Sequence, residues 1–379
     1  MRGVGARAAR GLLIGLLAGA CLGAPRPCAA APSSHPAWID EVTLDGFLST
    51  SYSYNFNRPA SGTNQFRVFD FDDNTFKLDE FELVAQKPAA NVREAGFRVD
   101  LTLGSSVPRV TAAAGLFRDA AGAAGDLDVH QAFLSYVAPL GSGLRLDAGK
   151  FITGHGYEVI DGYDGWNDHA TRSLLFGFAI PFTHVGLRAS GAFSPRVSGM
   201  VMLVNGWDVA RDNNRAKSLG AQLTVTPRPA LTLAVSGMTG PERNGNNHDR
   251  RDLLDLVAIY KATSRLTLGA NADFGTEANA VGPGQDGGWS GAAGYARMVL
   301  TERCALSVRV ESFSDGDGVR TGVPQRIREF TLTPEHRLSP HLLLRADLRV
   351  DRSNQRVFDD PPGLTRTQPT VLVNALYSF

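Results

Sequence analysis

The sequence contains very little cysteine. Of its three cysteines, Cys21 and Cys28 lie close to the N-terminus, and only Cys304 lies further along the chain. A disulfide framework needs cysteines in pairs, and a cysteine-rich metal site needs several thiolates. Beyond the first 30 residues, the chain can therefore build neither.

The sequence also lacks long hydrophobic runs. The one apolar run spans residues 12–22 and is too short for a transmembrane helix. Basic residues precede it, and Cys28-Ala29-Ala30 follows, which is the pattern of a secretory signal peptide. We expect residues 1–30 to be a signal peptide cleaved after Ala30. A lipoprotein acylated at Cys21 is the alternative, although Ala18 stands where such a signal usually has leucine.

Positive charge is not in excess. The formal net charge is +0, and without the leader arginines Arg2, Arg7, Arg10 and Arg26 there are 34 basic and 38 acidic residues, a net charge of −4. This balance argues against a nucleic-acid partner. The mean hydropathy of −0.11 and the absence of a second long apolar run exclude a helical membrane protein.

Apolar residues at helical spacing are almost absent, whereas strict alternation of apolar and polar residues occurs nearly everywhere. In the segment 266–274, leucine, alanine and phenylalanine alternate with Thr267, Gly269, Asn271 and Asp273. Each such segment is a strand with one apolar and one polar face. Further segments of this kind are 44–56, 95–103, 144–151, 183–193, 219–225, 306–311 and 342–351.

The connections between these segments alternate in length. Short ones carry turn residues, such as Ser194-Pro195-Arg196 and Ser339-Pro340-His341. Long, polar ones are expected at residues 57–75, 105–126, 152–179, 207–215, 240–251, 276–288, 314–325 and 352–367. Short and long connections in alternation are typical of an up-and-down barrel. We therefore predict an all-β fold, a transmembrane antiparallel barrel of about 16 strands over residues 43–379, after a short periplasmic segment at 31–42.

Aromatic residues and the chain end agree with a membrane barrel. Two belts are expected at the two interfaces: Tyr136, Phe193, Tyr260, Tyr377 and Phe379 near the short turns, and Tyr52, Tyr54, Phe56, Phe274 and Phe313 near the long loops. The last strand alternates and ends in phenylalanine, so we interpret Tyr377 and Phe379 as an assembly signal for the outer-membrane barrel assembly machinery.

One connection differs from the others. The segment 152–179, here called the constriction segment, is rich in glycine, acids and aromatics and lies between two strongly patterned strands. Long segments of this kind inside regular strand arrays are usually functional. We expect it to fold inward and narrow the barrel, although an external loop could be equally long.

Charged residues on the polar strand faces are expected to line the lumen. The predicted pore wall contains Arg98, Arg145, Arg188, Arg309, Arg345 and Arg349, and the constriction segment offers Glu158, Asp161, Asp164 and Asp168. An acidic segment opposite a basic wall would set a transverse field that influences ion selectivity. The alternative is that these charges only hydrate the lumen.

Two other chemistries were weighed. Ser173, His155, His169, His184 and Asp168 could supply catalytic groups, but no nucleophile motif surrounds them. The acids Asp70, Asp72, Asp73, Asp315 and Asp317 could bind Ca²⁺ through oxygen ligands, but neither run has an EF-hand pattern. We therefore predict no catalytic residue, no metal and no cofactor.

The sequence resembles the putative β-barrel porin-2 (OmpL-like) family. The resemblance is carried by Gly149-Lys150-Phe151, Gly156-Tyr157-Glu158, Trp166-Asn167, Ser173, residues 176–188, Asn205-Gly206-Trp207-Asp208 and the segment from Glu82 to Pro88. It covers most of the mature chain and is densest over 127–208. The sequence departs from the family pattern at His155, where proline is expected. The resemblance implies an outer-membrane porin.

We therefore expect a passive diffusion channel for ions and small hydrophilic solutes. The rival function is a non-conducting structural or adhesive barrel whose long external loops bind partners. Outer-membrane lipid and the assembly machinery are the expected partners, and analogy with barrels of this size suggests a homotrimer. Solute preference depends on loop geometry, so the sequence does not give it.

Overall fold

A computed structural model describes residues 37–111, 115–160 and 167–379. Its strands are β1 (Thr43–Asn55), β2 (Thr75–Lys87), β3 (Ala95–Leu103), β4 (Leu127–Ala138), β5 (Leu144–Ile152), β6 (Thr183–Ser194), β7 (Val197–Val204), β8 (Ser218–Arg228), β9 (Leu231–Pro241), β10 (Arg250–Lys261), β11 (Leu266–Gly282), β12 (Gln285–Val299), β13 (Cys304–Asp315), β14 (Gln325–Arg337), β15 (Leu342–Ser353), β16 (Phe358–Asp360), β17 (Gly363–Thr365) and β18 (Thr367–Ser378). The short helices are η1 (Ala37–Glu41), α2 (Val107–Val110) and η2 (Leu175–Ala179).

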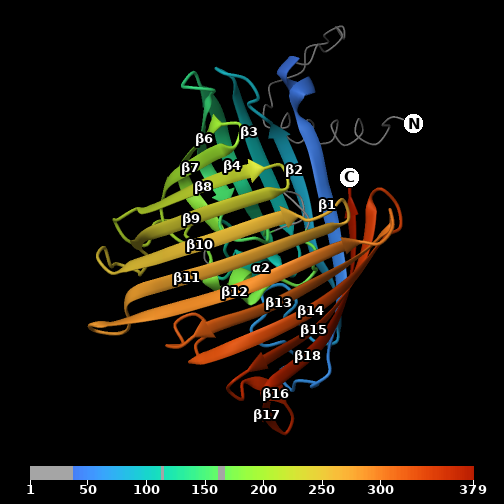
Figure 1. The fold of residues 1–379 in the computed structure, drawn as a ribbon. Helices are drawn as coiled ribbons and strands as arrows, with labels where there is room; N and C mark the ends of the chain where they lie inside the picture. Colours follow the sequence, from blue (N-terminus) through green and yellow to red (C-terminus); the bar gives the residue numbers. More distant parts are fainter. Residues whose placement is uncertain (1–36, 112–114, 161–166) are drawn as a thin grey trace, which may run out of the picture.

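Sixteen of these strands form one closed antiparallel barrel, which confirms the predicted fold (Figure 1). Each strand pairs with its neighbours in the chain, and β1 pairs with β18 to close the sheet, with Phe47 opposite Ser378. The strands β16 and β17 form a separate hairpin within the long connection from β15 to β18. Among the described residues, no helix is long and apolar enough to span a membrane.

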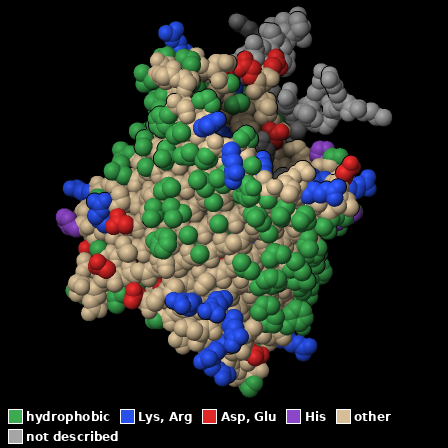
Figure 2. Space-filling model, in the orientation of Figure 1, with side chains coloured by type: hydrophobic (Ala, Val, Ile, Leu, Met, Phe, Trp, Pro, Cys, Tyr) green, Lys and Arg blue, Asp and Glu red, His purple; other side chains and the backbone are tan. Residues whose placement is uncertain are grey.

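The alternation in the sequence places apolar side chains outside and polar ones inside. On β1, Ser49, Ser51 and Ser53 are buried in the barrel, whereas Leu48 is exposed on the outer wall. The same division holds along β11, where Asp273 is buried and Phe274 is exposed. Figure 2 shows the resulting apolar surface across the outer wall. A lipid environment favours apolar side chains on the outer wall. It also requires a closed sheet, because only a closed sheet pairs all of its backbone groups internally.

One predicted loop is wrong. The segment 276–288 was expected to be a long connection, but β11 continues to Gly282 and β12 begins at Gln285. The two strands pair directly at Gly282 and Gln285, and Gly284 adopts a positive φ of 74° in the turn. The error arose because glycine and polar residues look like loop, whereas backbone hydrogen bonds extend a hairpin whatever its side chains.

Phe313 is also misplaced in the predicted aromatic belt. Its side chain is fully buried inside the barrel, on the same face of β13 as Glu311, and its ring lies 6.0 Å from that of Phe178. Other members of the belts, such as Phe193 and Phe274, are exposed on the outer wall. The period of two along β13 places Phe313 on the inner face, because residues 311 and 313 must share one face.

Much of the interior is filled by an apolar cluster. It includes Phe151, Phe176, Trp207, Trp289 and Phe313, drawn from strands, loops and η2. The rings of Trp207 and Trp289 meet edge to face, with centroids 6.1 Å apart. Side chains therefore occupy part of the lumen and limit the space that remains for water.

Candidate functional site

The described parts of the constriction segment, residues 152–160 and 167–179, lie inside the barrel against its inner wall. The segment begins after β5 and ends before β6, and its backbone amides contact lumen-facing acids on distant strands. The Gly156 amide donates to Asp255 on β10 at 2.9 Å. The Leu174 and Leu175 amides donate to Glu311 on β13 at 2.9 and 3.1 Å. Carboxylates of the wall thus satisfy backbone donors that would otherwise be buried without partners.

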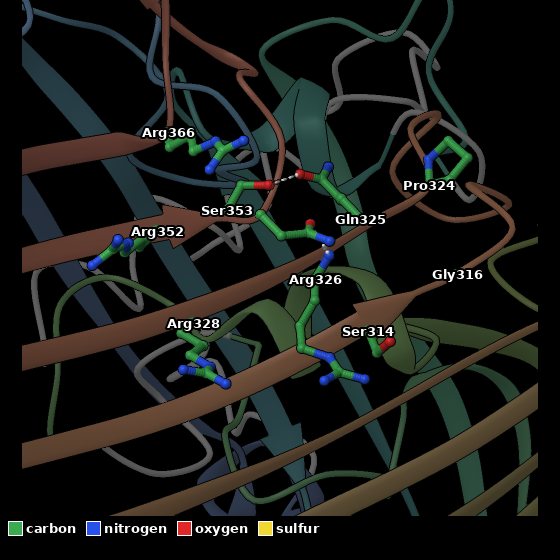
Figure 3. A pocket seen from close by; sticks show the side chains of 10 residues that line it. Ser314, Gly316, Pro324, Gln325, Arg326, Arg328, Arg352, Ser353 and Arg366 are labelled. Atoms are coloured by element: carbon green, nitrogen blue, oxygen red, sulfur yellow. Dashed lines mark hydrogen bonds between the residues drawn. The ribbon is translucent and has the colours of Figure 1, made fainter.

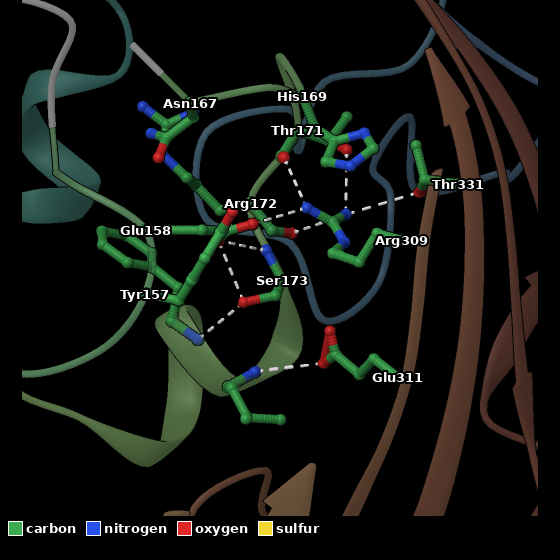
Figure 4. A network of polar contacts seen from close by, with 12 residues as sticks. Tyr157, Glu158, Asn167, His169, Thr171, Arg172, Ser173, Arg309, Glu311 and Thr331 are labelled. Atoms are coloured by element: carbon green, nitrogen blue, oxygen red, sulfur yellow. Dashed lines mark hydrogen bonds and ion pairs between the residues drawn. The ribbon is translucent and has the colours of Figure 1, made fainter. Parts of the chain in front are cut away.

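Glu158 and Arg309 form the central ion pair of this attachment (Figure 4). The Arg309 Nη1 to Glu158 Oε1 distance is 2.7 Å, and both side chains are almost completely buried. The other carboxylate oxygen of Glu158 accepts hydrogen bonds from the Ser173 amide and hydroxyl at 2.8 and 2.9 Å. Arg309 also pairs with Glu329 on β14 at 3.1 Å. Glu158 therefore joins two ends of the constriction segment to the wall.

Two further wall arginines bind the segment through its carbonyl groups. Arg345 Nη1 donates to the Asn167 carbonyl at 2.7 Å, and Arg349 Nη1 donates to the Arg172 carbonyl at 2.6 Å. Between them, Asp347 accepts hydrogen bonds from the amide and hydroxyl of Thr171 at 2.7 and 2.8 Å. Asp347 and Arg349 are almost completely buried beneath the segment and act as attachments, whereas Arg345 also borders a narrow cavity.

The C-terminal end of the segment is held from the other side. The Trp289 indole donates to the Ala179 carbonyl at 3.1 Å, and Arg320 donates to the Phe178 carbonyl at 2.6 Å. Asp208 accepts hydrogen bonds from the Phe182 and Thr183 amides at 2.6 and 2.9 Å. Burial raises the pKa of Asp208 to about 6, against the two amide hydrogen bonds, which lower it.

Asp168 lies at a less buried point of the segment. Its carboxylate is 3.1 Å from Arg297 on β12, and Arg297 also pairs with Glu335 at 2.8 Å. Burial raises the pKa of Asp168, against the attraction of Arg297. Asp161 and Asp164 lie outside the described residues, so the structure does not place them.

The histidines and Ser173 do not form a catalytic arrangement in the contacts that the structure describes. The Ser173 hydroxyl donates to Glu158 and accepts from the Phe176 amide. His169 Nδ1 bonds to Thr333 at 2.7 Å, and His155 packs against His184 with ring centroids 6.3 Å apart. Burial lowers the pKa of His155 to about 4, so its imidazole is neutral at pH 7. His155 therefore fills the position of the expected proline as a buried ring.

The remaining predicted wall arginines line a vestibule near the short turns. Arg98, Arg145 and Arg188 border a cavity of ≈ 490 Å³, together with Ile152, Thr153 and Val159 of the constriction region. Arg98 pairs with Asp100 at 2.7 Å, whereas Arg145 and Arg188 share Asp147, each at 2.9 Å. Two guanidinium groups on one carboxylate leave a local excess of positive charge.

A narrower cavity contains residues that sequence reasoning missed. It measures ≈ 50 Å³ and brings Asp79 and Glu80 of β2 opposite Arg172 and Arg345. Here the segment contributes an arginine, and the wall contributes both Arg345 and two acids, which differs from the expected acidic segment opposite a basic wall. A β-bulge explains the omission: Ser49 pairs with Glu80 and Thr50 with Leu78, so Asp79 is the extra residue. In residues 76–87, apolar and polar residues do not alternate cleanly, and this irregularity was the signal for a bulge in the sequence.

A second small cavity lies beside the narrow cavity. A space of ≈ 10 Å³ between Thr102, His130 and Ile160 adjoins the narrow cavity, and the two share Phe69, Glu80 and Ser106. A single water molecule needs about 10–15 Å³ when volume is measured in this way. These two spaces are therefore on the scale of water and small ions.

The acids considered for Ca²⁺ already have protein partners. Asp70 pairs with Arg67, and Asp73 accepts a hydrogen bond from the Asn55 amide at 2.6 Å. Asp315 accepts hydrogen bonds from the amide and hydroxyl of Thr321 at 2.7 and 2.8 Å. Within the described ranges, no group of three or more His, Cys, Asp or Glu side chains could hold a metal ion.

The two residues of the predicted assembly signal lie at the seam of the barrel. The Phe379 amide donates to the Gly46 carbonyl at 3.0 Å, and the Gly46 amide donates to the Phe379 carbonyl at 3.1 Å. The Phe379 ring stacks on Phe81 with centroids 6.2 Å apart. Tyr377 faces outward beside His341, with ring centroids 5.9 Å apart.

Comparison with known sequences identifies the family. The model of the family described as "Putative beta-barrel porin-2, OmpL-like" matches residues 41–379. The chain belongs to this family. Together with the closed barrel, this membership makes it an outer-membrane channel protein. A search of curated proteins finds no match.

Solved structures share the barrel at low sequence identity. The anion-selective porin from Comamonas acidovorans is 13% identical, with a TM-score of 0.59 over 89% of this chain and 99% of its own. The outer-membrane channel DcaP of Acinetobacter baumannii is 12% identical, with a TM-score of 0.60 over 89% and 97%. The trimer form of OmpT of Vibrio cholerae is 12% identical, with a TM-score of 0.59 over 89% and 99%. These likenesses concern the fold.

Proposed function

We propose that the protein conducts ions and small hydrophilic solutes passively, through a passage between the constriction segment and the wall of β1–β4. The attachment of the segment carries this proposal. Its charged contacts go to β10 and β12–β15, and the two narrow cavities are bordered by β1–β4 together with Arg345 of β15 and residues of β18. The proposed passage is therefore bounded by the attached segment on one side and by the wall around the β1–β18 seam on the other.

The predicted pore residues then divide into two roles. Arg98, Arg145 and Arg188 face the vestibule and act on permeating ions directly. Arg309, Arg345 and Arg349 hold the segment in place, with Glu158 as the main partner. Asp79 and Glu80 opposite Arg172 supply a transverse field across the narrow cavity.

Recording in a planar bilayer tests this function. The parent should give discrete conductance steps, and R145Q/R188Q should shift the reversal potential toward cations under a salt gradient. R265Q/R303Q is the matched control, because it removes two exposed arginines in the short turns. A parent that inserts and never conducts would favour the adhesive barrel instead. An equal shift in both double variants would show that Arg145 and Arg188 do not line the pore.

The proposal places the short turns in the periplasm and the long loops outside, the usual orientation of bacterial barrels. Cleavage after Ala30 would release the chain on the periplasmic side, and the assembly machinery would then recognise the strand that ends in Phe379. The protein needs no catalytic group and no cofactor for this function.

A homotrimer is the proposed assembly. An apolar hollow of ≈ 630 Å³ on the outer wall is bordered by Leu134, Tyr136, Leu187, Val201 and Leu219. Its location on the outer face over β4–β8 gives a neighbouring subunit or lipid an apolar surface to cover. Chemical cross-linking in native membranes should give a ladder ending at three subunits. A product that stops at one subunit would contradict the assembly.

A further inference from the structure

Four arginines gather on the outer wall at the long-loop end of the barrel (Figure 3). Arg326 and Arg328 of β14, Arg352 of β15 and Arg366 before β18 line a hollow of ≈ 730 Å³. All four side chains are exposed. The hollow is lined by described residues, and no aspartate or glutamate is among them.

The cluster is unfavourable for the protein alone. Arg328 lies directly opposite Arg352 in the strand register, and like charges in this position destabilise a sheet. On the inner face, the neighbouring Arg349 pairs with Asp351 at 2.9 Å. The outer guanidinium groups have no such partner in the part of the chain that the structure describes. An anion from outside would relieve their repulsion.

The position of the cluster indicates which anion could reach it. The next outward residues toward the middle of the wall are Phe330 and Val350, which are 46% and 42% exposed. The charges therefore begin where the apolar surface ends, and Figure 2 shows a group of basic side chains near the lower end of the molecule, beside a patch of hydrophobic side chains. A soluble anion would make no contact with Phe330 and Val350, whereas a lipid would place its acyl chains against them.

Backbone contacts hold the arginine-bearing strands in a fixed arrangement. The Asn354 side chain accepts a hydrogen bond from the Arg326 amide at 2.8 Å, and the Asn354 amide donates to the Arg326 carbonyl at 3.1 Å. The Ser353 amide donates to the Arg366 carbonyl at 2.9 Å. The backbone positions of the cluster are therefore set before any ligand arrives, which lowers the entropy lost on binding.

We propose that this arginine cluster binds the phosphate groups of a phosphorylated glycolipid in the outer leaflet of the outer membrane. Arginine matches phosphate because its planar guanidinium group can donate two parallel hydrogen bonds. The acyl chains of the lipid would lie against Phe330 and Val350. The inference uses the orientation given above, with long loops outside, and it does not depend on conduction.

Titration of the full-length barrel in a neutral detergent tests the site. The probe is fluorescent bisphosphorylated lipid A, compared with its dephosphorylated form and with inorganic phosphate as competitor. R328Q/R352Q should bind the bisphosphorylated probe about 25-fold more weakly, since each arginine near a membrane surface contributes about fivefold. R211Q/R215Q is the matched control, with two exposed arginines removed from another long loop. Heat modifiability on gels confirms that each variant is folded.

The outcomes separate the alternatives. We expect R328Q/R352Q to lose affinity for the phosphorylated lipid and not for its dephosphorylated form. We expect millimolar phosphate not to compete with the lipid. R352Q should also unfold no earlier than the parent in neutral detergent, because it removes a like-charge pair. Equal affinity of R328Q/R352Q and parent, or an equal loss in R211Q/R215Q, would overturn the site. Full competition by inorganic phosphate would replace the lipid by a free anion.

Discussion

At the residue scale, the buried charges of this barrel attach one segment to the wall. Glu158 is the best example, because its carboxylate bridges Arg309 of β13 and the Ser173 backbone and hydroxyl. A buried pair is costly to form, but the loss of one partner leaves the other charge uncompensated. The value of such a pair lies in fixing one arrangement of the segment.

Glu158→Gln should therefore loosen the constriction segment. We expect a loss of about 3 kcal/mol in the free energy of unfolding, because Arg309 keeps Glu329 but loses one buried carboxylate. Urea unfolding in lipid vesicles measures this change, and bilayer recording should show noisier open currents. Asp168→Asn is the control, since that pair with Arg297 is partly exposed and contributes about 0–1 kcal/mol. Equal effects of the two variants would contradict the central role of Glu158.

Asp208 gives the attachment a pH dependence. Its pKa is raised from 3.8 to about 6, so the folded protein favours the neutral acid. Ionisation costs stability as the pH rises from about 4 through about 6, and this cost is absent below pH 3.8. Asp208→Asn should weaken the pH dependence of the urea midpoint between pH 4 and 7, and it should raise the midpoint at pH 7. Asp360→Asn, an exposed carboxylate in the β16–β17 hairpin, should leave the pH profile of the parent intact.

At the element scale, the pairing of β1 with β18 closes the barrel. The pairing extends from Phe47–Ser378 to Asn55–Thr370, and Phe379 adds two backbone hydrogen bonds with Gly46. A membrane barrel cannot leave this seam open, because an unpaired edge would expose backbone groups to lipid. The last residue of the chain is thus part of the closure.

Deletion of Phe379 should lower the fraction of barrel that folds. The deletion removes both hydrogen bonds with Gly46 and the ring that stacks on Phe81. The measurement is the heat-modifiable fraction on gels, together with degradation in the periplasm. Phe193→Ala removes another exposed aromatic near a short turn and should fold normally. A deletion variant that folds at the parental yield would refute an assembly role for Phe379.

At the scale of the whole molecule, one segment divides the lumen. Its charged attachments go to β10 and β12–β15, the narrow cavities border β1–β4, β15 and β18, and an apolar cluster that includes Trp289 occupies part of the interior. Strand pairing surrounds this arrangement and does not require it. We therefore expect the strands to pair and close the barrel even without the constriction segment.

Replacement of residues 155–173 by a short glycine linker should leave a folded barrel and raise its conductance. The strands keep their pairing, whereas the obstruction in the lumen is removed. Bilayer recording gives the conductance, and heat modifiability gives the folded fraction. The control replaces residues 242–249, the long connection between β9 and β10, by the same linker. If the first variant folds and conducts like the parent, the constriction segment does not limit the pore.

The sequence determined the barrel because alternation is a local property. A period of two assigns each side chain to one face, and this assignment correctly placed Ser49 inside and Leu48 outside without knowledge of any partner strand. The number of strands and the inward segment followed from the same pattern and from connection lengths. Where a bulge interrupts the alternation, as at Asp79, the pattern does not assign the side chain to either face of the strand.

Only the tertiary structure decided what the charges do. Arg98 and Arg309 look alike in sequence, since both stand on a polar strand face, yet one lines the vestibule and the other is buried against Glu158. The difference depends on where the constriction segment lies, and that is set by contacts between residues far apart in the chain, such as Arg172 and Arg349, which are 177 positions apart. Periodicity along a strand carries no information about such distant partners, because it reports only the face on which a side chain stands.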